Sequence, residues 1–330
     1  MSRRATGLLL TLAALALVLL LSVSVGARPI PLDRVWGLVW HPDGSDDAII
    51  VHDLRIPRTV LGLLVGAALG VAGALMQAIT RNPLADPGLL GINAGAAAAV
   101  VSATALLGAA DPLAYIWFAF LGAAAVSVVV YGIGATGRSG ATPVRLALAG
   151  TAVSFALIAY VQGLTLVDRE TLDQYRFWQV GSLAGHPASL NAQLAPFIVA
   201  GLLLALALGR ALNAIGLGDE AGRALGAHPL RTRALAAVAI TLLCGTATAA
   251  AGPIVFVGLT VPHVARAITG PDQRWVMPYS ALLAAVMLLG ADAIGRVVNR
   301  PGELEVGIVS ALLGGPAFIA IVRRRWIAQL

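Results

Sequence analysis

The charged residues of this chain are few, and several stand in groups whose spacing could do chemistry. Only 12% of the 330 residues are charged, against about a quarter in an average soluble domain. The largest group is "IGLGDEAGRALGAHPLRTR", which begins at Ile215 and lies between two long apolar runs. It holds two acids, three arginines and one histidine. Such a group suits contacts with a polar partner.

Within that group, residues 218–226 have the features of a short helix. Asp219 and Glu220 suit the positive end of a helix dipole, and Gly226 suits the left-handed conformation that often ends a helix. Glu220 and Arg223 lie three positions apart, on one face. We predict a rigid polar helix here; the plain alternative is a solvated loop.

The types of charged residue exclude one energy source. All 22 basic residues are arginine, and a phosphate-binding P-loop needs a lysine. The chain therefore cannot hydrolyse ATP by that route alone. Ion-coupled carriers mark their path with ionisable residues inside apolar runs, and here the candidates are His263 and Asp292. Asp292 precedes Arg296 by four positions, which favours an ion pair on one helix face over a proton relay; for His263 a hydrogen bond near a helix end is favoured over a ligand role.

The cysteine content further narrows the classes of protein to which this chain could belong. The one cysteine, Cys244, excludes disulfides and multi-cysteine metal sites within a single chain. The acid–base or metal-binding clusters that a membrane enzyme needs are not found in the apolar runs. A transport protein driven by another polypeptide fits these observations, although composition leaves a structural membrane subunit or a membrane enzyme open.

The elements that must position these residues are membrane helices. The chain is 58% hydrophobic, with a mean hydropathy of +0.87, and it repeats apolar runs of about 20 residues, enough to cross a hydrocarbon core of about 30 Å. The run 234–265 would form a helix of about 48 Å, too long for one upright span, and Gly252-Pro253 offers a break. We predict ten spans, at 7–25, 59–79, 92–109, 112–134, 144–165, 192–213, two within 234–265, 277–295 and 304–322.

The distribution of charge predicts the orientation of these spans. An even number places both termini on one side of the membrane. With cytoplasmic termini, arginines are more numerous in the inner segments, as the positive-inside rule requires, and the acids gather in the outer segments. This places 214–233 in the cytoplasm. We expect the span 7–25 to be retained, although "VGA" before Arg28 resembles a signal-peptide cleavage site.

Several long motifs are similar, in order, to those of the type II ABC importer permeases, which serve iron–siderophore complexes, haem and vitamin B12. The resemblance covers nearly the whole chain. "RFWQVGSL" and "LCGTATAAAGPIVFVGL" resemble most the ferric-siderophore branch, particularly the catecholate (ferric enterobactin) permease subunits. The matching motifs are "RIPRTVLGLLVGAALGVAGALMQAITRNPLADPGLLGINAGA" (55–96), "LALAGTAVS" (146–154), "RFWQVGSLAG" (176–185), "GDEAGRALG" (218–226), "AGPIVFVGLTVPHVARAITGPDQRW" (251–275) and "GELEVGIVSALLGGPAFIAIVRRR" (302–325).

The resemblance implies an all-α polytopic fold, with residues 1–330 forming one permease domain in the plasma (inner) membrane. It implies a second permease subunit, identical or not, two ATPase subunits that bind the ATP, and an extracytoplasmic siderophore-binding protein. The cargo would be a ferric-siderophore complex. The chain itself would be no enzyme, and it would hold no cofactor or metal and bind no nucleic acid. A haem or vitamin B12 permease and a proton-coupled secondary transporter remain as alternatives.

The resemblance also implies roles for particular residues. The segment 214–233 matches the cytoplasmic coupling segment, and three arginines match positions that dock the binding protein. Two turns match the inner gate, one of them within "SGATP" (139–143), and polar positions on two spans match the path lining. The coupling residues are Gly218, Asp219, Glu220, Arg223, Ala224, Leu225 and Gly226; the docking residues are Arg55, Arg58 and Arg296; the gate residues are Asn82, Pro83, Asp86, Pro87, Thr142 and Pro143; the path residues are Thr151, Ser154, Gln162 and Ser310.

Overall fold

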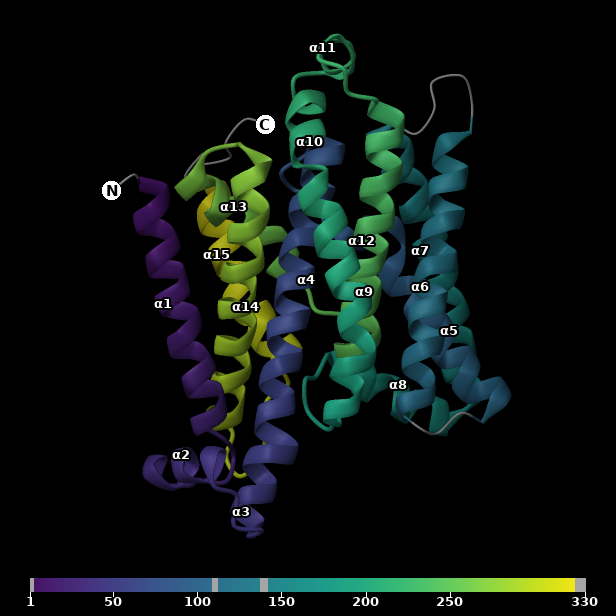
Figure 1. The fold of residues 1–330 in the computed structure, drawn as a ribbon. Coiled ribbons are helices and arrows are strands. Elements are labelled where there is room, and N and C mark those ends of the chain that lie inside the picture. The colour runs from purple at the N-terminus through teal and green to yellow at the C-terminus, as the bar shows by residue number, and fades with distance from the viewer. Residues whose placement is uncertain (1–2, 109–111, 137–141, 324–330) are drawn as a thin grey trace.

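The computed structural model describes residues 3–108, 112–136 and 142–323 as a bundle of helices with no strand in those ranges (Figure 1). Seven helices in this part of the chain are long and apolar enough to cross a membrane. They are α1 (Arg3–Ser24), α4 (Ile56–Thr80), α6 (Pro112–Ala135), α7 (Pro143–Val167), α9 (Ala188–Ala207), α12 (Pro229–Ala251) and α14 (Gln273–Val298).

Three shorter helices fall on the remaining predicted spans. They are α5 (Ile92–Leu107), α13 (Val257–Thr269) and α15 (Val306–Arg323). At 13 residues, α13 is about 20 Å long and shorter than the hydrocarbon core. The helical membrane fold is therefore confirmed, while the number of ten spans stays a prediction.

The predicted break in the run 234–265 is present. Helix α12 ends at Ala251, and Gly252 takes a φ of 71°, a left-handed conformation that favours glycine. Pro253 follows, and α13 begins only at Val257. The glycine and the proline thus divide the run in two.

Short helices that the apolar runs did not predict cover both ends of the bundle. At one end lie α2 (Leu32–Trp40), α3 (Asp46–Ile49), the π-helix η1 (Ile50–Arg55) that leads into α4, and α8 (Arg169–Val180). At the other lie α10 (Gly209–Gly216) and α11 (Asp219–Ala224), together with the start of α1 (Figure 1). The predicted span 192–213 is therefore too long at its C-terminal side, since α9 ends at Ala207 and a separate helix follows.

Helix α4 runs through the bundle and packs closely through its glycines. A Cβ on Gly70 would collide with the Ser280 carbonyl of α14, and one on Gly73 with the Gly258 carbonyl of α13. Small residues allow such close backbone approach in lipid. The glycines of α4 therefore allow it to pack closely against both α13 and α14.

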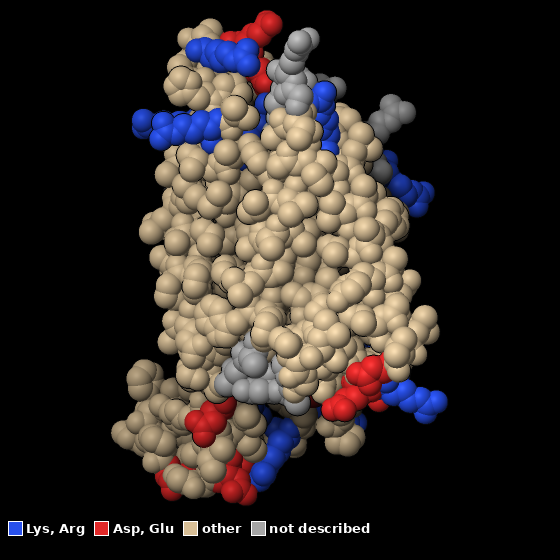
Figure 2. Space-filling model, turned by 90° about the vertical axis from the view of Figure 1, so that its right-hand side faces the viewer, with Lys and Arg blue, Asp and Glu red and all other residues tan. Residues whose placement is uncertain are grey.

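Charged side chains gather at the two ends of the bundle, and the visible face between them is an uncharged belt (Figure 2). Lipid excludes unpaired charge, and it has no water to hydrate it. The belt therefore marks the membrane-embedded part of the molecule.

Candidate functional site

The predicted coupling segment, residues 214–233, lies at one end of the bundle, where α10 and α11 form a helical hairpin. Helix α11 ends in two backbone bonds, from the Gly226 N–H to the Arg223 carbonyl and from the Ala227 N–H to the Gly222 carbonyl. This pattern with Gly226 at a φ of 80° is a Schellman stop. The predicted helix and its glycine stop are thus present, and the outer side of the hairpin exposes Glu220, Arg223, Ala224 and Leu225.

Asp219 faces the bundle instead. Its carboxylate accepts two hydrogen bonds from the Arg233 guanidinium, at 2.7 and 3.0 Å, and another from Arg81. The hydrogen bond from Arg233 is the main reason why the pKa of Asp219 lies below its ordinary value. Arg233 is buried and lies in the second turn of α12.

The first predicted gate segment forms a tight turn after α4. Asn82 and Asp86 each accept a hydrogen bond from a backbone N–H two residues later, as is typical of Asx turns. The Asp86 bond opens a 3₁₀-helix, η2 (Pro87–Leu90). Pro83 is half-buried and Pro87 is buried.

The turn packs back against the bundle. The Leu89 carbonyl lies against Gly150 of α7, and the Pro87 ring against Gly258 of α13. In the second gate segment Thr142 caps α7 and Pro143 occupies its first turn, while residues 139–141 lie outside the described part of the chain. A helix rises 1.5 Å per residue, so the contact of Leu89 with Gly150 lies about 12 Å along α7 from Thr142. The two predicted gate segments therefore reach α7 at different levels.

Two predicted path residues lie beside this turn, which is called the gate turn and comprises residues 81–91. Thr151 and Ser154 line a cavity of about 200 Å³ together with Gly88 and Leu89. Gln162 is exposed on the same helix, α7. Ser310 is completely buried and donates to the Gly307 carbonyl, and its role in lining the path stays a prediction.

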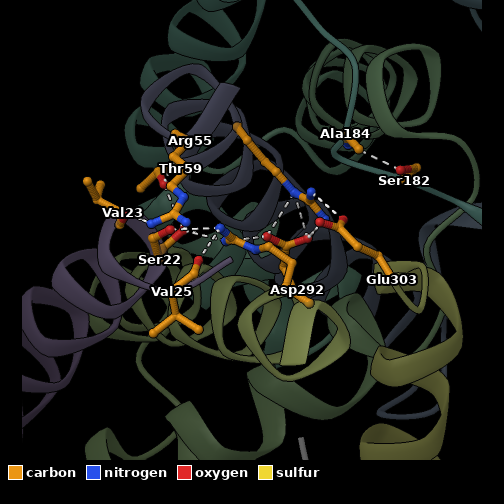
Figure 3. A network of polar contacts seen from close by, with 11 residues as sticks. Ser22, Val23, Val25, Arg55, Thr59, Ser182, Ala184, Asp292 and Glu303 are labelled. Carbon is orange, nitrogen blue, oxygen red and sulfur yellow. Dashed lines mark hydrogen bonds and ion pairs between the residues drawn. The ribbon is translucent and has the colours of Figure 1, made fainter. Parts of the chain in front are cut away.

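At the opposite end, the three predicted docking arginines are buried and bonded within the chain. The Arg58 guanidinium binds Asp292 at 2.7 Å and Glu303 at 2.6 Å. Arg296 binds the other Asp292 oxygen at 2.6 Å. The predicted pair between Asp292 and Arg296 is thus confirmed, and Figure 3 shows Asp292 in the middle of the network with Glu303 at one side.

Arg55 and Arg296 also fasten α1 to the bundle. Arg55 donates to the carbonyls of Val23 and Ser24, and Arg296 to those of Ser22 and Val25. At the other end of α1, the Tyr279 hydroxyl donates to the Arg4 carbonyl. Both ends of α1 are therefore bonded to the rest of the bundle.

In this conformation the three predicted docking arginines are not open groups. Arg55, Arg58 and Arg296 are only 4%, 8% and 1% exposed. Their docking role stays a prediction, and a carboxylate on another protein would have to replace the partners that they have within the chain. The sequence could not show this, because Arg58 and Asp292 are 234 positions apart.

A cavity of about 500 Å³ lies beneath α8, at the same end as this network. Tyr115, Phe177 and Trp178 give it aromatic walls, and Glu305 and His186 give it polar ones. Burial lowers the pKa of His186, which keeps this imidazole neutral at pH 7. Sequence reasoning missed this pocket because its lining comes from five separate segments.

The His263 side chain contacts Arg266 in the last turn of α13, so it has the favoured hydrogen bond near a helix end. It lies within α13, where its Nδ1 is 2.7 Å from an Arg266 Nη atom. Arg266 also donates to the Gln77 side chain of α4. The described part of the chain contains no group of three or more His, Cys, Asp or Glu residues that could hold a metal ion.

A helical bundle with an uncharged belt between two charged ends defines a polytopic membrane protein. The chain belongs to the FecCD transport family, which matches residues 14–324. It is thus a permease subunit of an ABC importer and not an enzyme.

Individual relatives agree with this assignment. The chain is 47% identical to the ferric enterobactin transport system permease protein FepD of Escherichia coli, over 92% of this chain and 91% of the relative. It is 42% identical to the Fe(3+)-citrate import system permease protein YfmD of Bacillus subtilis, over 92% and 90%. The fold matches a solved inward-facing metal-chelate type ABC transporter with a TM-score of 0.83 at 24% identity, over 95% of this chain and 97% of that one.

Proposed function

We propose that this chain carries ferric-siderophore complexes across the plasma membrane into the cytoplasm. The observation that supports this most is the 47% identity to a ferric enterobactin permease over nine-tenths of both chains. Iron-labelled ferric enterobactin should enter cells that contain the chain and should not enter a deletion strain. Normal uptake in the deletion strain would contradict the proposed cargo.

The chain works within a larger assembly in this proposal. A second permease subunit completes the path, two ATPase subunits bind at the α10–α11 hairpin, and an extracytoplasmic binding protein docks at the end that carries α2, α3 and α8. The buried arginine network supports that docking surface from below by joining α1, α4 and α14. Both termini lie in the cytoplasm, on the side of the hairpin.

The exposed side of α11 is the surface that the ATPase contacts in this proposal. Glu220→Arg reverses an exposed charge there, and Gly226→Pro forces a φ of about −65° where the structure has 80°. Both variants should lose co-purifying ATPase and iron uptake. The matched control is Glu170→Arg, because Glu170 is also exposed in the first turn of a helix, but at the opposite end of the bundle.

The control should keep the ATPase bound. Retention of the ATPase and full uptake in both hairpin variants would contradict the coupling role. Uptake that continues with an inactive ATPase partner would instead favour a proton-coupled carrier.

A further inference from the structure

Asp219 differs from the other polar residues of α11 in the direction that it faces. Glu220 and Arg223 are exposed, whereas the Asp219 side chain is about one-third exposed and is held by two arginines of the bundle. A carboxylate that already binds two arginines has few free hydrogen-bonding positions for a partner protein. The role of Asp219 therefore lies within the permease.

The two arginines belong to different elements. Arg233 lies in the second turn of α12 and is buried; it holds Asp219 with both Nη atoms. Arg81 is the residue that follows α4, and it begins the gate turn 81–91. Asp219 therefore joins α11 to α12 and to the gate turn at the same time.

The backbone conformation of Arg81 supports a specific role for its contact with Asp219. Arg81 has a φ of 49° and is one of two non-glycine residues with a positive φ in the described part of the chain. A bulky residue rarely adopts this left-handed conformation. The sharp change of direction ends α4 and starts the turn while the Arg81 side chain remains bonded to Asp219.

From Arg81 the contact continues to the path. The turn that Arg81 begins packs on α7 at Gly150 and on α13 at Gly258. It also forms one wall of the cavity lined by Thr151 and Ser154. A displacement of α11 would thus be transmitted by the Asp219 carboxylate to Arg81 and the gate turn, at the inner end of the path.

The energy of these ion pairs is secondary to their geometry. The pair between Asp219 and Arg81 is partly exposed, and such pairs add little to stability. The two parallel bonds between the buried Arg233 guanidinium and Asp219 fix the relative orientation of these groups. Loss of the Asp219 charge should therefore loosen the position of α11, and loss of the exposed Arg81 charge should break the contact with the gate turn without unfolding the bundle.

We propose that Asp219 is a positioning residue that transmits the movement of α11 to the gate turn 81–91 and makes no contact with the ATPase. This inference rests on the proposed function. It divides the predicted coupling segment into an outer side for the ATPase and one inward residue for transmission.

The test uses the complete transporter in proteoliposomes, with its ATPase, its binding protein and ferric enterobactin. Asp219→Asn and Arg81→Gln should keep the ATPase bound and hydrolysing ATP. Iron transported per ATP hydrolysed should fall at least about fivefold, the lower end of the usual coupling between two sites. The double variant should be no worse than either single one, and Arg81→Lys should recover part of the loss because it keeps the charge.

Other outcomes separate the possible failures. Loss of the ATPase from Asp219→Asn would show a direct contact, and unchanged transport per ATP would show no transmission; either would overturn the proposal. Arg81 is more than a third exposed, so Arg81→Gln remains a valid test if Asp219→Asn misfolds. Failure of the unmodified chain to bind any ATPase would overturn the proposed function itself.

Discussion

At Asp292 one carboxylate serves two guanidinium groups in the interior of the protein. Arg58 donates to both of its oxygens and Arg296 to one of them, and Asp292 is completely buried. A buried charge is tolerated only when it is paired and hydrogen-bonded. The carboxylate therefore permits both arginines to remain inside the bundle.

Asp292→Asn should lower stability strongly, because it leaves two buried guanidinium groups with less counter-charge. Breaking a buried ion pair by removing one partner costs about 3–5 kcal/mol. Thermal unfolding of the purified protein in detergent measures the effect. Asp43→Asn is the control, since Asp43 pairs with Arg34 on the surface; an equal fall in Tm in both variants would contradict this account.

At the scale of elements, three helices meet where glycines replace larger side chains. Helix α4 touches α14 at Gly66 and Gly70 and touches α13 at Gly73. Interiors packed to crystal density have no room for an added methyl group. The contact between α4 and α13 also includes hydrogen bonds. The Gln77 amide of α4 donates to the Gly258 and Leu259 carbonyls of α13.

Gly73→Ala should lower Tm, because the added methyl group separates α4 from α13. Overpacking of this kind costs about 1–3 kcal/mol. Gly290→Ala is the matched control, since Gly290 also lies within a long helix but has open space around its Cβ position. Alanine favours helix over glycine by up to about 1 kcal/mol, so the control should keep or raise Tm. Equal losses would show that packing at Gly73 is unimportant.

The predicted elements were those with long apolar runs or a polar group bounded by glycine. Helix α11 was predicted from Asp219, Glu220 and Gly226, and the break before α13 from Gly252-Pro253. Helices α2, α8 and α10 were missed, since each is only 8–12 residues long. Short helices owe their stability to tertiary packing more than to local propensity.

At the scale of the whole molecule, the uncharged belt and the two charged ends define a membrane orientation that single cysteines can test. The native Cys244 is buried. Arg274 and Asp43 are exposed at opposite ends of the bundle. With the hairpin end in the cytoplasm, an impermeant maleimide should label Asp43→Cys in intact spheroplasts and Arg274→Cys only after permeabilisation. The reverse pattern would invert the proposed orientation.

The sequence by itself determined the membrane class, most of the span positions, the polar helix 219–224 and the family. Each depends on local composition, on spacing within one helix or on motif order. The tertiary structure decided which way the charges face: it buried Arg55, Arg58 and Arg296, turned Asp219 toward Arg81 and Arg233, and placed Ser310 in the interior. Pairing between residues far apart in the chain arises only when helices pack, so no local pattern in one sequence could reveal it.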